Sequence, residues 1–253
     1  MDAIPKVKIF GLPIWGIDVE GLTALICEWV DRREGHWIAT LNLDYIARCA
    51  RSPEFHRLIS QADVFTADGM PVLRACQKVD SRFGGLDRTT GADLTPSLLE
   101  RLEPSDVAII GGVDPASALR KLGKDPASYF IFDGKVELEG VWVEELARKI
   151  GARGAVFVAL GCPKQEHLIS ILRHYLPNAV FVAVGGSFEM MSGMKSRAPQ
   201  WMQRAGLEWL HRLMIEPKRL WRRYLVEYPP GVFALYREVR AARRTASSTL
   251  PPS

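Results

Sequence analysis

Apolar residues recur along the first two hundred positions in two alternating patterns. Short runs rich in β-branched and aromatic residues predict strands, and helix-length amphipathic segments lie between them. The predicted strands are Val7–Phe10, Trp37–Leu41, Val64–Ala67, Val107–Ile110, Tyr129–Phe132, Ala155–Leu160 and Ala179–Val184. The predicted helices are Val19–Arg33, Leu43–Ser60, Ala92–Leu102, Pro115–Leu122, Val141–Ile150 and Gln165–Tyr175. Near-continuous apolar strands alternating with helices predict an α/β fold, with a mostly parallel sheet covered by helices on both faces.

The pattern changes beyond Gly193. A helical stretch follows Arg197-Ala-Pro199, and Glu216-Pro217 is typical of the start of a further helix. We therefore expect an α/β domain over residues 1–195 and a helical C-terminal appendage over residues 196–244. Residues 245–253 are small, polar and proline-bearing, which predicts a disordered tail.

Composition is ordinary for a globular protein, with 47% hydrophobic and 25% charged residues. The apolar runs are too short to cross a bilayer, and the N-terminus lacks the features of a signal peptide, so we expect a cytoplasmic protein. The cysteines are widely separated, and the histidines have no metal-binding spacing. We accordingly expect neither a structural metal nor another cofactor.

Charge is distributed unevenly along the chain. Residues 195–244 hold twelve Lys or Arg against four Glu, whereas the remainder is mildly acidic and the whole chain has a net charge of +4. A basic appendage of this kind predicts an anionic partner, namely phosphate groups, nucleic acid or an acidic membrane surface.

Several predicted strands run directly into glycine, at Gly111-Gly112, Gly161 and Gly185-Gly186. In Rossmann-like sheets ligands bind beyond the carboxyl ends of the strands, where glycine lets them approach backbone N–H groups. The glycines alone fit a nucleotide crevice and ordinary turns equally well. Neither the dinucleotide fingerprint G-x-G-x-x-G nor a P-loop motif follows a strand.

Candidate polar side chains follow the same strands. Asp68 ends a strand and is placed either as a general base or as the N-cap of a helix beginning near Met70. Thr40, Asn42 and Gln165 supply neutral donors and acceptors that suit sugar hydroxyls and uracil edges, although turns and caps use the same residue types.

The sequence has no D-x-D carboxylate pair of the kind that holds a divalent cation against a nucleotide diphosphate. The basic appendage is the alternative source of positive charge, through Arg212, Arg219, Arg222 and Arg223. These arginines and their aromatic neighbours suit substrate phosphate, anionic lipid headgroups or a solvated helix face, and we favour a role shared between substrate and lipid.

Motifs along residues 7–228 resemble, in order and spacing, those of the bacterial WecG/TagA/CpsF glycosyltransferase family (glycosyltransferase family 26). They are Thr40-Leu-Asn42, Ala67-Asp68-Gly69, Arg88-Thr-Thr-Gly91-Ala-Asp93, Ile110-Gly-Gly112, Leu160-Gly-Cys-Pro-Lys-Gln-Glu166, Val184-Gly-Gly-Ser-Phe-Glu189, Ser192-Gly193, Arg197-Ala-Pro199, Gly206-Leu-Glu-Trp209, Arg212-Leu213, Glu216-Pro217 and Arg222-Arg-Tyr224. Single motifs of this kind are weak, but this many in sequence are specific.

The resemblance implies an inverting, metal-independent transferase that moves a sugar, of the N-acetylmannosamine type in the best-known members, from a UDP-sugar to a polyprenyl-diphosphate-linked acceptor. It carries the base role onto Asp68 and phosphate contacts onto Arg212, Arg219 and Arg222. Contacts with the rest of the substrates fall on Thr40, Asn42, Arg88, Gly112, Gly161, Gln165, Gly185, Gly186 and Arg197.

In this family the appendage is thought to close the site and meet the membrane, which implies peripheral association with the inner face of the cell membrane. The segment from Asp125 to Leu138 departs from the family pattern, so the resemblance does not identify the donor sugar. Self-association into a homo-oligomer is compatible with an aromatic appendage. The alternatives are a basic nucleic-acid-binding α/β protein, for which recognised motifs are missing, and an NAD-linked oxidoreductase, for which the glycine fingerprint is missing.

Overall fold

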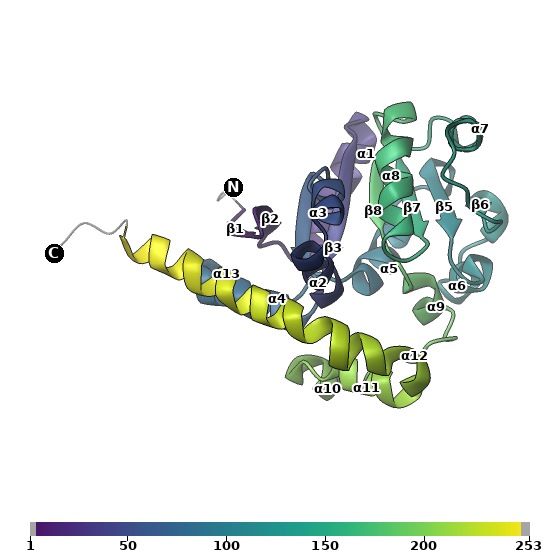
Figure 1. Cartoon of the computed structure of the whole chain (residues 1–253). Helices are drawn as coiled ribbons and strands as arrows, with labels where there is room; N and C mark the ends of the chain where they lie inside the picture. Colours follow the sequence, from purple (N-terminus) through teal and green to yellow (C-terminus); the bar gives the residue numbers. More distant parts are fainter. Residues whose placement is uncertain (1–3, 249–253) are drawn as a thin grey trace.

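The computed structural model describes residues 4–248 and shows one sheet with helices on both of its faces (Figure 1). The sheet has eight strands in the order β1-β2-β4-β3-β8-β7-β5-β6, and every pair is parallel except the β1–β2 hairpin at one edge. The strands are β1 Lys6–Ile9, β2 Leu12–Trp15, β3 His36–Leu41, β4 Val64–Ala67, β5 Val107–Gly111, β6 Phe130–Phe132, β7 Ala155–Ala159 and β8 Val180–Ala183. The predicted fold class is thereby confirmed.

The sheet divides the apolar core into two layers, one on each of its faces. One apolar layer lies between the sheet and α2, α3, α4, α7, α8 and α13, and the other between the sheet and α1, α5, α6 and α9. The helices are α1 Val19–Arg32, α2 Leu43–Arg51, α3 Pro53–Ile59, α4 Met70–Val79, α5 Gly91–Arg101, α6 Pro115–Lys121, α7 Gly140–Ile150, α8 Lys164–Tyr175, α9 Ser187–Met191, α10 Gln200–Ala205, α11 Glu208–Ile215, α12 Pro217–Arg222 and α13 Tyr228–Ser248, and short 3₁₀ turns span Ser81–Phe83, Pro104–Asp106 and Pro126–Ser128.

The edge hairpin is the main addition to the predicted sheet. Phe10 and Gly11 both have positive φ, which matches a tight hairpin turn, and they return the chain into β2. Pro13 breaks the strand pattern in the sequence, because proline cannot donate to a ladder and occurs mainly at sheet edges. In the structure β2 is a short strand whose Ile14 lies in register with Phe65 of β4.

The predicted helix Leu43–Ser60 is wrong, because the chain forms two helices there. Pro53 lacks a backbone N–H and begins α3, and the Ser52 hydroxyl accepts a hydrogen bond from the Phe55 amide at 3.1 Å. Helix α2 begins two residues after β3, so its first turn lies at the carboxyl end of that strand.

The C-terminal helices cross the body at the carboxyl ends of the strands. A π-helical turn, Arg223–Glu227, joins α12 to α13, and α13 runs along α2 and α4 (Figure 1). At the crossing with α2, Gly231 packs so closely on Ala47 that an added Cβ would lie 2.7 Å from the Ala47 Cβ. The tail predicted to be disordered begins at Thr245, and α13 ends at Ser248; residues 249–253 of that tail lie outside the described residues.

Candidate active site

A small polar cavity lies beyond the carboxyl ends of β3, β4 and β8, where the parallel strands place their following residues together. It has a volume of about 120 Å³. Its lining consists of Thr40, Asn42, Tyr45, Asp68, Thr90, Gly91, Ala92, Gln165, Ala183, Val184, Gly185, Gly186, Ser187, Met190, Arg197, Glu208 and Arg212. Most of these residues are polar or glycine, so the cavity suits a ligand rich in hydrogen-bonding groups.

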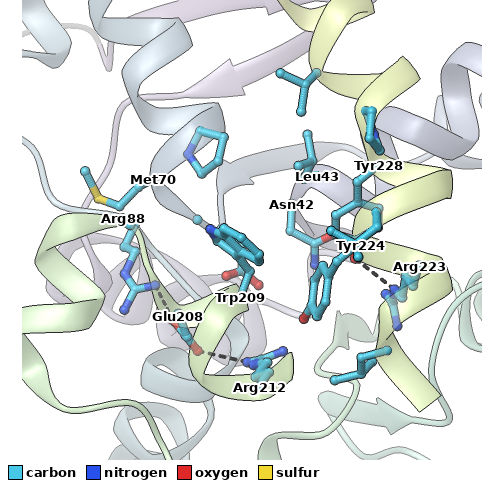
Figure 2. Close-up of a pocket in the computed structure, with 18 of the residues that line it drawn as sticks. Asn42, Leu43, Met70, Arg88, Glu208, Trp209, Arg212, Arg223, Tyr224 and Tyr228 are labelled. Atoms are coloured by element: carbon cyan, nitrogen blue, oxygen red, sulfur yellow. Dashed lines mark hydrogen bonds and ion pairs between the residues drawn. The ribbon is translucent and has the colours of Figure 1, made fainter. Parts of the chain in front are cut away.

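A larger cavity of about 530 Å³ lies between the body and the C-terminal helices (Figure 2). Its lining consists of Asn42, Leu43, Asp68, Gly69, Met70, Pro71, Arg88, Gly206, Glu208, Trp209, Arg212, Arg219, Leu220, Arg223, Tyr224, Leu225, Tyr228, Pro229, Val232 and Phe233. This lining combines aromatic and aliphatic side chains with arginines. The two cavities adjoin, because both are lined by Asn42, Asp68, Glu208 and Arg212.

Asp68 follows β4 and lies at the junction of the two cavities. Gly69, at a φ of 118°, is the N-cap residue of α4 and no side chain caps this helix, so the alternative of Asp68 as a helix cap is wrong. One Asp68 carboxylate oxygen instead accepts from the Thr40 hydroxyl at 3.3 Å. Burial raises the pKa of Asp68 to about 6, against the opposing effect of nearby Arg212.

Thr40 near the end of β3, Asn42 just after β3 and Gln165 at the start of α8 come together at the small cavity. Asn42 also caps α2, its side-chain oxygen accepting from the Asp44 amide at 2.9 Å. Gln165 is buried and bridges α2 and the turn that follows β8. Its oxygen accepts from the Gly185 amide at 3.2 Å, and its nitrogen donates to the Tyr45 hydroxyl at 3.1 Å. These contacts fix the orientation of the amide, although Tyr45 itself carried no prediction.

The predicted glycines divide into two groups. Gly185 and Gly186 line the small cavity, whereas Gly112 and Gly161 line neither cavity. Gly112 has a φ of 83° and donates its N–H to the Ala159 carbonyl at 2.8 Å. Gly161 has a φ of 74°, which also favours glycine. Both therefore serve the turns that follow β5 and β7.

The appendage arginines are likewise divided. Arg212 lines both cavities and Arg219 lines the larger one, but Arg222 lines neither, and its side chain is 75% exposed. Arg223 lines the larger cavity in its place, donates to the Tyr228 hydroxyl at 2.8 Å and pairs with buried Asp44 at 2.9 Å (Figure 2). The spacing of four residues between Arg219 and Arg223 was the available sequence signal, because such residues share a helix face.

Arg88 and Arg197 connect the body to the appendage region. Arg88 is almost completely buried and donates to Glu208 at 2.6 Å and to Gln203 at 2.7 Å. Arg197 forms a two-pronged ion pair with Asp93 at 2.5 and 2.7 Å and lines the small cavity. The sequence motifs contained Glu208, but nothing in its position along the chain indicated that it receives Arg88.

The described residues contain no group of three or more His, Cys, Asp or Glu side chains that could hold a metal ion. In the same part of the chain, no helix combines the length and apolar character needed to span a bilayer. Large apolar side chains are nevertheless exposed on α11–α13 and the connecting turn. They include Met214, Ile215, Trp221, Leu225, Val226, Phe233 and Tyr236.

Comparison with known proteins agrees with this geometry. Residues 7–245 match the model of the "Glycosyl transferase WecG/TagA/CpsF family". A curated relative from Bacillus spizizenii, an N-acetylglucosaminyldiphosphoundecaprenol N-acetyl-beta-D-mannosaminyltransferase, is 33% identical over 225 residues, which cover 85% of this chain and 84% of the relative. Both likenesses extend over the body and the C-terminal helices, and on this evidence the chain belongs to the WecG/TagA/CpsF family of glycosyltransferases.

Proposed function

We propose that this glycosyltransferase moves a sugar from a UDP-sugar to a polyprenyl-diphosphate-linked sugar acceptor during synthesis of a cell-surface polysaccharide. The observation that carries the proposal is the junction of a polar cavity and an apolar, arginine-lined cavity at one carboxylate, Asp68. A donor rich in hydroxyls and an acceptor that joins a sugar to diphosphate and lipid have matching chemistries. The relative is named for an N-acetylglucosaminyldiphosphoundecaprenol acceptor and an N-acetyl-beta-D-mannosaminyl group, which supports the proposed acceptor and the kind of sugar moved.

The small cavity supplies the donor contacts in this proposal. Thr40, Asn42 and the backbone around Gly185 and Gly186 offer neutral hydrogen-bonding groups at the strand ends. Gln165 is held rigidly by Tyr45 and the Gly185 amide, so its position requires little ordering when a ligand binds. We place the hydroxyl-bearing part of the donor here, with its diphosphate directed toward Arg212.

The larger cavity supplies the acceptor contacts. Arg219 and Arg223 are placed to meet phosphate, while Trp209, Tyr224 and Tyr228 offer apolar surface to the lipid (Figure 2). The family resemblance implied a contact between Arg222 and substrate phosphate, but Arg222 lies outside both cavities. We assign Arg222 to anionic lipid headgroups.

The mechanism is a direct displacement with inversion. Asp68 takes the proton of the acceptor hydroxyl, and the hydroxyl oxygen forms a bond to the anomeric carbon of the donor. The bond between that carbon and the UDP oxygen breaks on the opposite face. Arg212 stabilises the negative charge of departing UDP, so the arginine supplies the charge neutralisation that a divalent cation provides in other transferases.

The exposed apolar and basic side chains of the appendage support peripheral binding to the inner face of the cell membrane. Aromatic and aliphatic side chains enter the interfacial region while arginines meet anionic headgroups. A lipid-linked acceptor would then enter the larger cavity from the membrane surface. In this proposal the reaction takes place at the membrane surface.

The decisive test is UDP release from a panel of UDP-sugars in EDTA, with and without a short-chain polyprenyl-diphosphate-N-acetylglucosamine analogue. We expect release that requires the acceptor, survives EDTA and is greatest with UDP-N-acetylmannosamine. A requirement for added metal would overturn the proposed metal independence. Absence of release from every donor, together with absence of UDP binding by calorimetry, would overturn the function.

A further inference from the structure

Glu208, the first residue of α11, occupies a central position that the proposed reaction does not use. Its carboxylate accepts from Arg88 of the body at 2.6 Å and from Arg212 of its own helix at 2.9 Å (Figure 2). The side chain is largely buried, and it lines both cavities. One carboxylate therefore joins two arginines at the junction where Asp68 lies.

The surroundings of Asp68 make this arrangement significant. The polar groups that face it are Thr40 from β3, Arg88 from the loop before α5, Arg197 from the segment before α10, and Glu208 and Arg212 from α11. Within residues 4–248, no arginine or lysine is within ion-pair distance of the Asp68 carboxylate. The arginines closest to Asp68 pair with other carboxylates instead. Arg88 and Arg212 pair with Glu208, and Arg197 pairs with Asp93.

We propose that Glu208 is a positioning residue that holds Arg88 and Arg212 away from direct pairing with Asp68, leaving this carboxylate free to receive the proton of the acceptor hydroxyl. The inference rests on the proposed function. It adds a residue to the reaction without a contact to the reacting atoms, because Glu208 acts through the two arginines.

The physical reason is competition between two carboxylates for the same cations. A carboxylate in a direct ion pair with arginine has a depressed pKa and is a weak base. Glu208 engages one nitrogen of Arg88 and one of Arg212, so the other donors of Arg212 stay available to a diphosphate. The negative charge of Glu208 also raises the pKa of Asp68, opposing Arg212 and Arg88.

The same contacts connect proton transfer to the position of the appendage. Arg88 belongs to the body, whereas Glu208 and Arg212 lie on α11. The arrangement that keeps Asp68 unpaired therefore exists only while α11 rests against the body. Asp68 becomes a competent base when the larger cavity is closed by its helices.

The test compares wild type with Glu208→Gln, which keeps the shape of the side chain and removes its charge. We expect the acidic limb of the kcat profile to move to lower pH by about one unit, and the plateau rate to fall about tenfold. Glu144→Gln is the matched control, because Glu144 forms an exposed i,i+4 pair with Arg148 on α7. This control should leave both the limb and the plateau unchanged.

A readout independent of turnover is the carbon-13 NMR titration of the Asp68 carboxyl in the full chain. Asp68 should titrate at lower pH in Glu208→Gln than in wild type, and Glu208→Asp should lie between them. An unchanged Asp68 titration in a folded Glu208→Gln protein would overturn the inference even if the transferase activity stands. If Glu208→Gln does not fold, the same comparison with Glu208→Asp decides. If the wild-type protein has no transferase activity, the proposed function is wrong, but the titration still tests the role of Glu208.

Discussion

The two cavities that meet at Asp68 are built from different kinds of structure. The small cavity is lined mainly by residues at the carboxyl ends of β3, β4 and β8 and in the turns beyond them, and Glu208 and Arg212 of α11 complete it. The larger cavity is lined on one side by the body and on the other by α11–α13, so its shape depends on how these helices pack. The sheet edge thus supplies the neutral donor contacts of the proposal, whereas Arg212 and the acceptor contacts depend on packing of the C-terminal helices against the body.

The largest effect is expected at the junction itself. Asp68→Asn should lower kcat by about 10²–10⁴-fold with little change in UDP binding, because the amide cannot accept the proton. Since burial raises the pKa of Asp68, its ionised form costs stability above pH 6, and the variant should melt at an equal or higher temperature. Steady-state kinetics and thermal melting check both outcomes, with Asp133→Asn at an exposed position as the surface control. Near-normal turnover would remove Asp68 from the mechanism.

The next effect distinguishes two arginines of the C-terminal helices, one that lines the cavities and one that does not. Arg212→Gln should lower kcat by roughly 10–100-fold, since it removes a charged hydrogen-bond donor from the leaving diphosphate. Arg222→Gln should retain its rate on a detergent-soluble acceptor and bind anionic vesicles more weakly. Kinetics and vesicle sedimentation measure the two properties. Equal losses of rate in both variants would contradict the assignment of Arg222 to lipid.

The pH dependence sharpens the role of the junction. Only the ionised form of Asp68 accepts a proton, and burial places its pKa at about 6 instead of 3.8. The rate should therefore be constant above pH 7 and about tenfold below its plateau at pH 5. A kcat profile recorded with saturating substrates checks this expectation. Full activity at pH 5 would indicate a carboxylate with an ordinary pKa or a different base.

The smallest effect should fall on the larger cavity alone. Gly231→Ala places a methyl group against Ala47 where α13 crosses α2, and overpacking of this kind costs about 1–3 kcal/mol. We expect a KM for the acceptor several-fold higher, with UDP binding unchanged by calorimetry. Gly140→Ala, at the start of α7 in open space, is the matched control. A matching loss of UDP binding would show that the two cavities are not independent.

Local sequence predicted most of the sheet because its signals are local. Every strand foreseen from an apolar run begins and ends within one residue of its place in the structure. Buried parallel strands such as β5, β7 and β8 are apolar along nearly their whole length, which makes them visible in the sequence. Strand β2 lacked that signal, because it is only four residues long and Pro13 interrupts its apolar residues. The break between α2 and α3 had a signal in the sequence, since Ser52-Pro53 is typical of a helix start. The amphipathic pattern continues across this proline, and it favoured a single helix.

The candidate site also has a part that the sequence predicts and a part that it does not. From the sequence alone, Thr40 was placed at the end of a strand and Asn42, Asp68 and Gln165 just beyond strands. Parallel strands bring such residues to one edge of the sheet. Only the tertiary structure decided that Arg223 faces the larger cavity while Arg222 faces outward, and that Arg88 meets Glu208. Hydrophobic periodicity is a property of neighbours in the chain. The meeting of two side chains 120 positions apart depends on how helices pack, which no local pattern encodes.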